Sequence, residues 1–161
     1  MRKEPWFQLG WILSTFAGLI PLMVGVANYL YFILSMSDSH SPWQTPLGRL
    51  GFSLQQLRGF RSDLAANWVL LNQVGWANLV MSGVTVVVAS WAGIRHRSRW
   101  SWFLVLFGML WVGANDLNAT LILGSELGRT VAMPIVPMTL GAAGLALSAR
   151  GVFSSSPERS L

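Results

Sequence analysis

The sequence predicts an all-α integral membrane protein, a four-helix bundle with a short amphipathic helix in its external loop and both chain ends in the cytoplasm (N-in/C-in). Two observations predict the class. Hydrophobic residues make up 53% of the 161 residues, and charged residues make up 11%, against about 25% in an average soluble domain. Four long apolar stretches account for this excess. A globule of this size cannot hide so much apolar surface from water, so lipid is the expected solvent.

Each apolar stretch is long enough to cross a bilayer, which requires about 20 residues for a hydrocarbon core about 30 Å thick. The stretches cover about residues 7–36, 67–93, 100–123 and 130–149. They are continuous rather than alternating, which favours helices over barrel strands. The first is too long for a cleaved signal peptide and reads as a signal anchor. We therefore assign 1–152 to one transmembrane domain and 153–161 to a disordered tail.

The distribution of Lys and Arg predicts the orientation. With the N-terminus inside, seven basic residues lie on the cytoplasmic side and four on the outer side, as the positive-inside rule requires. The cytoplasmic connection at 94–99 alone holds Arg95, Arg97 and Arg99. Tryptophans fall near both predicted interfaces, as an aromatic belt does.

The external loop, residues 38–66, contains a predicted helix. Pro42 and Pro46 extend its start, and Ser53 with Gln56 has the form of a capping box. Leucines 50, 54, 57 and 64 approximate one helical face. This pattern predicts an amphipathic helix that lies on the membrane surface or caps the bundle. A polar loop with accidental leucine spacing is the alternative.

Polar side chains within the spans gather in the outer half of the bilayer. Asp116 is the only ionisable residue well inside a span, about 6 Å outward of the middle of the third. The candidate ligand-binding residues are Asp116, Asn115, Asn118, Asn78 and Asn28. Such residues are costly in lipid and often functional, so they can form a polar pocket open to the outside. Alternatively, the asparagines join helices by hydrogen bonds, worth about 0.6–2 kcal/mol each.

Several functional classes find no support. The chain has no cysteine, which excludes disulfide exchange and thiolate metal sites. His40 and His96 lie in loops on opposite sides of the membrane and cannot share a metal. No phosphate-binding loop, nucleophile elbow or zinc-protease motif occurs. We therefore expect no metal and no cofactor. We also expect no nucleic-acid partner, because the basic residues flank apolar runs instead of forming a basic stripe on a polar surface. An enzymatic role is not favoured but stays open.

The order of elements resembles a broad group of small, mostly uncharacterised four-helix bacterial membrane proteins, loosely DoxX-like. The resemblance rests on Gly51-Phe52-Ser53-Leu54 in the external segment. It also rests on the turn Arg95-His96-Arg97-Ser98-Arg99 with Trp100 and Trp102 after it. It implies the four-helix fold and a multi-pass protein of the bacterial inner (plasma) membrane. The cysteines of a redox-active member are missing.

Two functions compete. The first is a non-catalytic accessory or scaffold subunit of a larger membrane complex, with lipid, other membrane subunits or further copies of the chain as partners. The second is a small-ligand or lipid binder, transporter or lipid-modifying enzyme that uses the outer polar pocket around Asp116.

Overall fold

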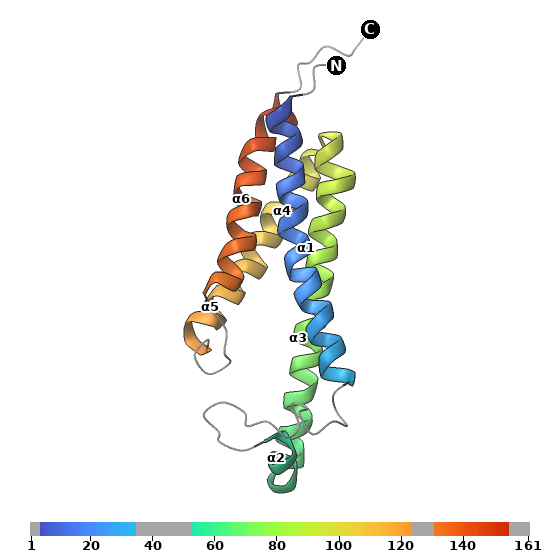
Figure 1. Ribbon diagram of the computed structural model, residues 1–161, viewed down its shortest axis with the longest axis vertical. Coiled ribbons are helices and arrows are strands. Elements are labelled where there is room, and N and C mark those ends of the chain that lie inside the picture. Colours follow the sequence, from blue (N-terminus) through green and yellow to red (C-terminus); the bar gives the residue numbers. More distant parts are fainter. Residues whose placement is uncertain (1–3, 35–52, 124–130, 155–161) are drawn as a thin grey trace.

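In the computed structural model the described residues, 4–34, 53–123 and 131–154, form an all-α helical bundle (Figure 1). Four helical segments are long and apolar enough to cross a membrane, which confirms the predicted fold class and a multi-pass membrane protein. The first segment is α1 (Pro5–Leu34). The second is α3 (Ser62–Val88) with its π-helical (Ala89–Gly93) and 3-10 (Ile94–His96) extensions. The third comprises α4 (Arg99–Gly108), a π-helical turn (Met109–Gly113) and α5 (Ala114–Leu123), and the fourth is α6 (Ala132–Phe153).

The start of α1 and the end of α6 lie at the same end of the bundle (Figure 1). We call it the arginine-turn end, because the connection between the second and third spans, residues 94–99, lies there too. The opposite end carries α2 (Leu54–Phe60), and we call it the α2 end.

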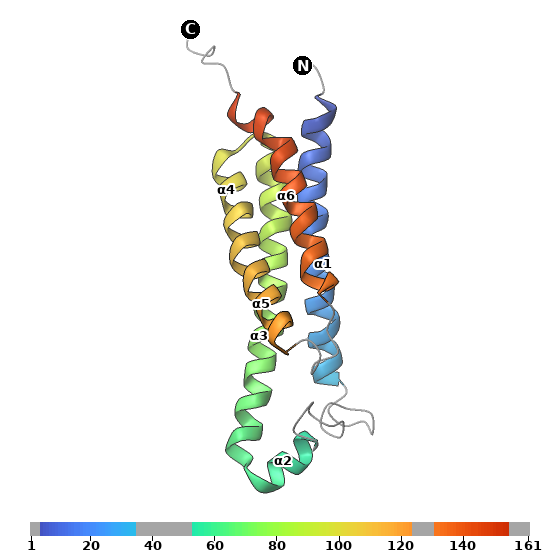
Figure 2. The ribbon, with the colours of Figure 1, turned by 90° about the vertical axis from the view of Figure 1, so that its left-hand side faces the viewer.

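The observed helices extend beyond two of the predicted spans. The second span begins at Ser62 rather than at residue 67, and the fourth ends at Phe153 rather than at residue 149. A helix tolerates polar residues once it has left the hydrocarbon, so apolar runs mark the membrane crossing and not the helix ends. With its extensions, the second span has 35 residues, about 52 Å at 1.5 Å per residue. This exceeds the bilayer core, and the helix projects at the α2 end (Figure 2).

The predicted external helix is confirmed as α2 (Leu54–Phe60). The Ser53 backbone N–H donates to Gln56 Oε1 at 2.7 Å, and the Gln56 N–H donates to Ser53 Oγ at 3.3 Å, so the capping box is present. Leu54 and Leu57 are buried against Ala65 of α3. The predicted leucine face was wrong for Leu64, which belongs to α3 and is 46% exposed, because the chain turns at Arg61. Leu50, Pro42 and Pro46 lie outside the described residues, as does the tail from residue 155.

Small residues let α1 approach two partner helices closely. On the α6 side, a Cβ built on Gly10 would lie 2.6 Å from the backbone nitrogen of Ser148. On the α3 side, a Cβ on Gly83 would lie 2.6 Å from the backbone nitrogen of Leu22. Helices in lipid associate through such close van der Waals packing, since the tails are as apolar as the side chains. Glycine and serine on α1 and α6 therefore stabilise the centre of the fold.

The main hydrophobic core lies in the half of the bundle nearest the arginine turn. Its buried members come from all four spans: Phe7, Val86, Ala89, Ile94, Val105, Leu145 and Val152. Toward the α2 end, α5 and α6 diverge from α1 and α3 (Figure 1). The second buried cluster lies beyond this divergence and joins only α2 to α3.

Candidate functional site

The predicted outer polar residues lie on three different helices. Asn28 of α1 is half-buried, and its amide donates to the Val24 carbonyl at 2.7 Å. Asn115 of α5 is exposed, and its amide donates to the Trp111 carbonyl at 2.6 Å. In both residues, one N–H donor of the side-chain amide is satisfied by a backbone carbonyl of the same helix.

Two further asparagines face outward. Asn78 of α3 and Asn118 of α5 are exposed, and neither side chain hydrogen bonds to another described residue. Asn78 lies about 3 Å from the middle of the predicted second span by helix rise. A polar amide at that depth costs about 1–3 kcal/mol unless a partner hydrogen bonds to it.

Asp116 is half-buried on α5. The contacts of Gly113 with Met138 and of Gly141 with Met109 set the register of this span on α6. That antiparallel register places Asp116 beside the first turn of α6. A carboxylate near a helix N-terminus is stabilised by the helix dipole.

The divergence of the helices separates these residues into two groups. α5 packs mainly on α6 and its own π-helical turn, whereas α1 packs on both α6 and α3. Asp116, Asn115 and Asn118 thus belong to one arm, and Asn28 and Asn78 to the other. A shared pocket around Asp116 stays a prediction.

A stripe on α3 that sequence reasoning missed contains Asn78. Val86, Ala89 and Gly93 are buried on α3 and its π-helical extension, where Val86 packs on Gly18 of α1 and Gly93 lies against Ser101 of α4. The same helical spacing continues outward through Ser82, Asn78 and Gly75, which we call the outer stripe. Asn78 and Gly75 are exposed, and nothing lies within 4 Å of a Cβ on Gly75. The recurrence of small residues at Gly75, Ser82, Ala89 and Gly93 was the signal in the sequence.

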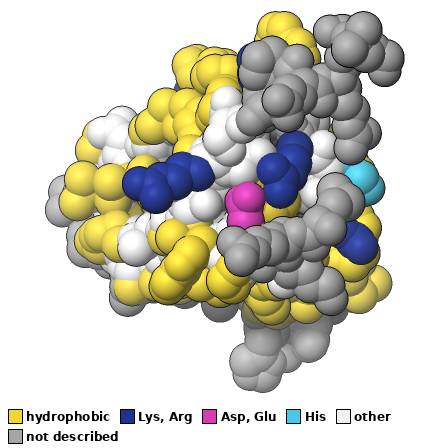
Figure 3. Space-filling model, turned by 90° about the horizontal axis from the view of Figure 1, so that it is seen from above, with side chains coloured by type: hydrophobic (Ala, Val, Ile, Leu, Met, Phe, Trp, Pro, Cys, Tyr) yellow, Lys and Arg dark blue, Asp and Glu magenta, His cyan; other side chains and the backbone are white. Residues whose placement is uncertain are grey.

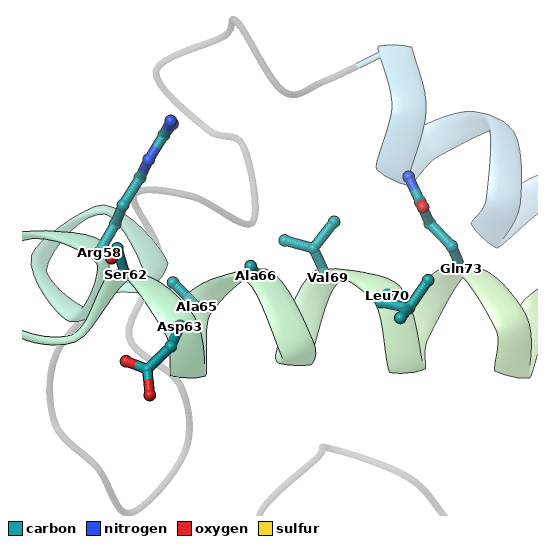
Figure 4. Close-up of a pocket in the computed structure, with 8 residues that line it drawn as sticks. All are labelled: Arg58, Ser62, Asp63, Ala65, Ala66, Val69, Leu70 and Gln73. Carbon is teal, nitrogen blue, oxygen red and sulfur yellow. The ribbon is translucent and has the colours of Figure 1, made fainter.

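A cavity of about 630 Å³ lies at the elbow between α2 and α3 (Figure 4). Its lining is one face of α3 with the end of α2: Arg58, Ser62, Asp63, Ala65, Ala66, Val69, Leu70 and Gln73. Figure 4 shows the Asp63 carboxylate directed away from the Arg58 guanidinium. Asp63 instead accepts hydrogen bonds from Arg61 at 3.0 and 2.8 Å, and these raise the pKa of Arg61. None of the five predicted site residues lines this cavity.

A group of interacting arginine and aromatic side chains lies at the opposite end, in the arginine turn. Arg95 Cζ lies 5.5 Å from the ring centroid of Trp11 and 5.1 Å from that of Trp91. The two indoles meet edge-to-face at 5.7 Å. An arginine held between two indoles gains cation–π attraction from both.

The other two arginines of the turn also lie over aromatic rings. Arg97 Cζ lies 4.9 Å from the Phe7 centroid, and Arg99 Cζ lies 5.9 Å from that of Phe153. Arg97 has φ 63°, and it donates to the Gly151 carbonyl at 3.2 Å and lies 3.8 Å from the Glu4 carboxylate. Viewed along the bundle axis, basic side chains lie on either side of an acidic one (Figure 3).

The sequence placed these arginines and tryptophans at one interface but could not pair them. His96, from the same turn, is exposed and contacts the Ala92 carbonyl at 2.9 Å; His40 lies outside the described residues. In the described ranges no group of three or more His, Cys, Asp or Glu residues could hold a metal ion. Comparison of the chain with family models, curated proteins and solved structures finds no match.

Proposed function

We propose that the chain is a non-catalytic accessory or scaffold subunit that receives a transmembrane helix of another subunit on the outer stripe of α3. The observation that carries this proposal is the exposed amide of Asn78 near the middle of the second span. A side chain that faced only lipid there would be apolar, because hydrocarbon offers no hydrogen-bond partner.

The residues around Asn78 suit a helix rather than lipid. Gly75 and Ser82, before and after Asn78 on the stripe, have small side chains that protrude little from the helix. Such small residues allow two helix backbones to approach closely. Closer to the arginine turn, the same spacing reaches residues that contact other helices, with Gly93 against Ser101 of α4 and Val86 against Gly18 of α1. The outer stripe thus continues a surface that already accepts a helix.

The third span supports the same proposal. Of its most apolar window, 11% is buried, against 28%, 33% and 28% in the first, second and fourth spans. Its exposed face carries Phe107 and Trp111, whose rings stack at 6.2 Å. Low burial within a single chain is expected of a subunit whose remaining helix contacts come from partners.

Photocrosslinking in native membranes tests the proposal. A photoreactive amino acid at Ser82 should yield one protein adduct whose mass exceeds the chain by a fixed amount. The same residue at Ala77, which is exposed but off the stripe, is the matched control and should yield lipid adducts only. Adding Asn78→Leu should reduce the Ser82 adduct about threefold to thirtyfold, as loss of about 0.6–2 kcal/mol implies.

The adduct's identity decides the outcome. Support requires the crosslinked protein to co-purify at fixed stoichiometry with the unsubstituted chain. An adduct of twice the chain's mass would replace the accessory role with self-association. Lipid adducts alone at Ser82 would overturn the proposal.

A ligand site around Asp116 is the second candidate, because an acidic residue within a span is costly and often functional. Asp116→Asn distinguishes the two. The accessory role expects unchanged complex stoichiometry in this variant, because Asp116 lies on another arm of the bundle. A ligand site expects the complex to persist while binding or activity is lost.

A further inference from the structure

We propose that the arginine turn binds the headgroup phosphate of an anionic phospholipid, with Arg95 as the principal ligand. This inference is independent of the outer stripe, which lies toward the other end of the spans. It assigns a specific lipid site, beyond the general attraction of basic residues to a negative membrane surface.

The first argument is preorganisation. Arg95 lies over the rings of Trp11 and Trp91, while Arg97 lies over Phe7 and donates to the Gly151 carbonyl. A guanidinium that lies over an aromatic ring keeps N–H donors that can bind an anion. These contacts restrict the side chains before a ligand binds, which lowers the entropic cost of binding.

The second argument is charge. Arg95, Arg97, Arg99 and Arg150 lie at this end, and Glu4 is the acidic residue described there. Glu4 lies 3.8 Å from Arg97, and the described residues give Arg95 no carboxylate partner. The excess of positive charge therefore suits an anion.

The third argument is residue type. Lys3 is the only lysine of the chain, and all three cations of the turn are arginines. Arginine binds phosphate through two parallel N–H donors, whereas lysine acts as a point charge.

The position of the turn selects a lipid rather than a free phosphate. Trp6, Trp91 and Trp100 are 66%, 54% and 85% exposed around it. Tryptophan is enriched at the headgroup level of membrane proteins. The guanidinium groups are therefore at the depth of lipid phosphates, and the adjacent indoles can contact the upper acyl chains.

Lipid binding to the purified full-length protein tests the site. The protein is placed in nanodiscs of phosphatidylcholine, with or without one-third phosphatidylglycerol, and retained lipids are counted by native mass spectrometry. We expect phosphatidylglycerol to be retained preferentially, and Arg95→Gln to weaken its binding about fivefold, from about 1 kcal/mol per basic residue at a membrane surface. Inorganic phosphate at the same concentration should not compete.

Two variants separate a built site from bulk charge. Arg95→Lys keeps the charge but loses the stacked, two-donor geometry, so we expect several-fold weaker binding. Arg58→Gln removes one charge from the α2 end and should leave binding unchanged. Equal binding by wild type, Arg95→Lys and Arg95→Gln would overturn the proposal, as would equal retention of phosphatidylcholine. Competition by inorganic phosphate would identify a soluble anion as the ligand instead. Thermal unfolding in phosphatidylcholine nanodiscs checks that each variant is folded.

Discussion

Helices α1 and α6 approach so closely at Gly10 and Ser148 that no side chain fits between them. A Cβ on Gly10 would lie 2.6 Å from the backbone nitrogen of Ser148 and 3.0 Å from its Cβ. The obstruction is largely backbone, which cannot rotate away as a flexible side chain can. This crossing therefore fixes the separation of the two helices that carry the chain ends.

Gly10→Ala should destabilise the protein by about 1–3 kcal/mol, the usual cost of forcing an extra carbon into a packed interior. Gly59→Ala is the matched control, because nothing lies within 4 Å of a Cβ at Gly59. It should be neutral or slightly stabilising, since alanine favours helix. Unfolding in mixed micelles by sodium dodecyl sulfate measures both. Equal stability of the two variants would show that the crossing relaxes freely.

Trp102→Phe should cost about 1 kcal/mol. The Trp102 indole N–H donates to the Leu145 carbonyl at 3.0 Å and so ties α4 to α6, and a hydrogen bond between transmembrane helices is worth about 0.6–2 kcal/mol. Trp100→Phe, two residues away and 85% exposed, keeps its aromatic ring at the interface and should change stability by less than about 0.5 kcal/mol. If the two variants have the same free energy of unfolding, the hydrogen bond contributes nothing measurable to stability.

Ser53→Ala should weaken α2 locally by about 1 kcal/mol, the typical cost of losing a helix N-cap. We expect about fivefold faster hydrogen exchange at the amides of α2, with the spans unaffected. Gln55→Ala, exposed on the same helix, is the control and should exchange at the wild-type rate. Unchanged exchange in Ser53→Ala would mean that Leu54 and Leu57 alone hold the helix in place.

The predicted orientation can be tested cleanly because the chain has no cysteine. Arg58→Cys should react with a membrane-impermeant maleimide in intact cells, since Arg58 is exposed at the α2 end. His96→Cys, exposed at the arginine-turn end, should react only after permeabilisation. The reverse pattern would place the arginine turn outside and contradict the positive-inside assignment.

The sequence by itself determined the membrane fold and the capped external helix. A continuous apolar run of about 20 residues is unstable in water. In lipid it forms a helix, because a helix satisfies its own backbone hydrogen bonds, so length and hydropathy suffice to predict the spans. The capping box is equally local, because Ser53 and Gln56 are three residues apart. The asparagines and Asp116 could be placed by depth from the helix rise alone.

Only the tertiary structure decided which side of each helix meets another and which aromatic ring each arginine contacts. In lipid both sides of a span are apolar, so hydrophobic periodicity does not mark the buried side. The π-helical turn Met109–Gly113 also changes the helical phase between α4 and α5. The close contacts of Gly10 with Ser148 and of Gly83 with Leu22 join residues far apart in the chain, so local sequence does not reveal them.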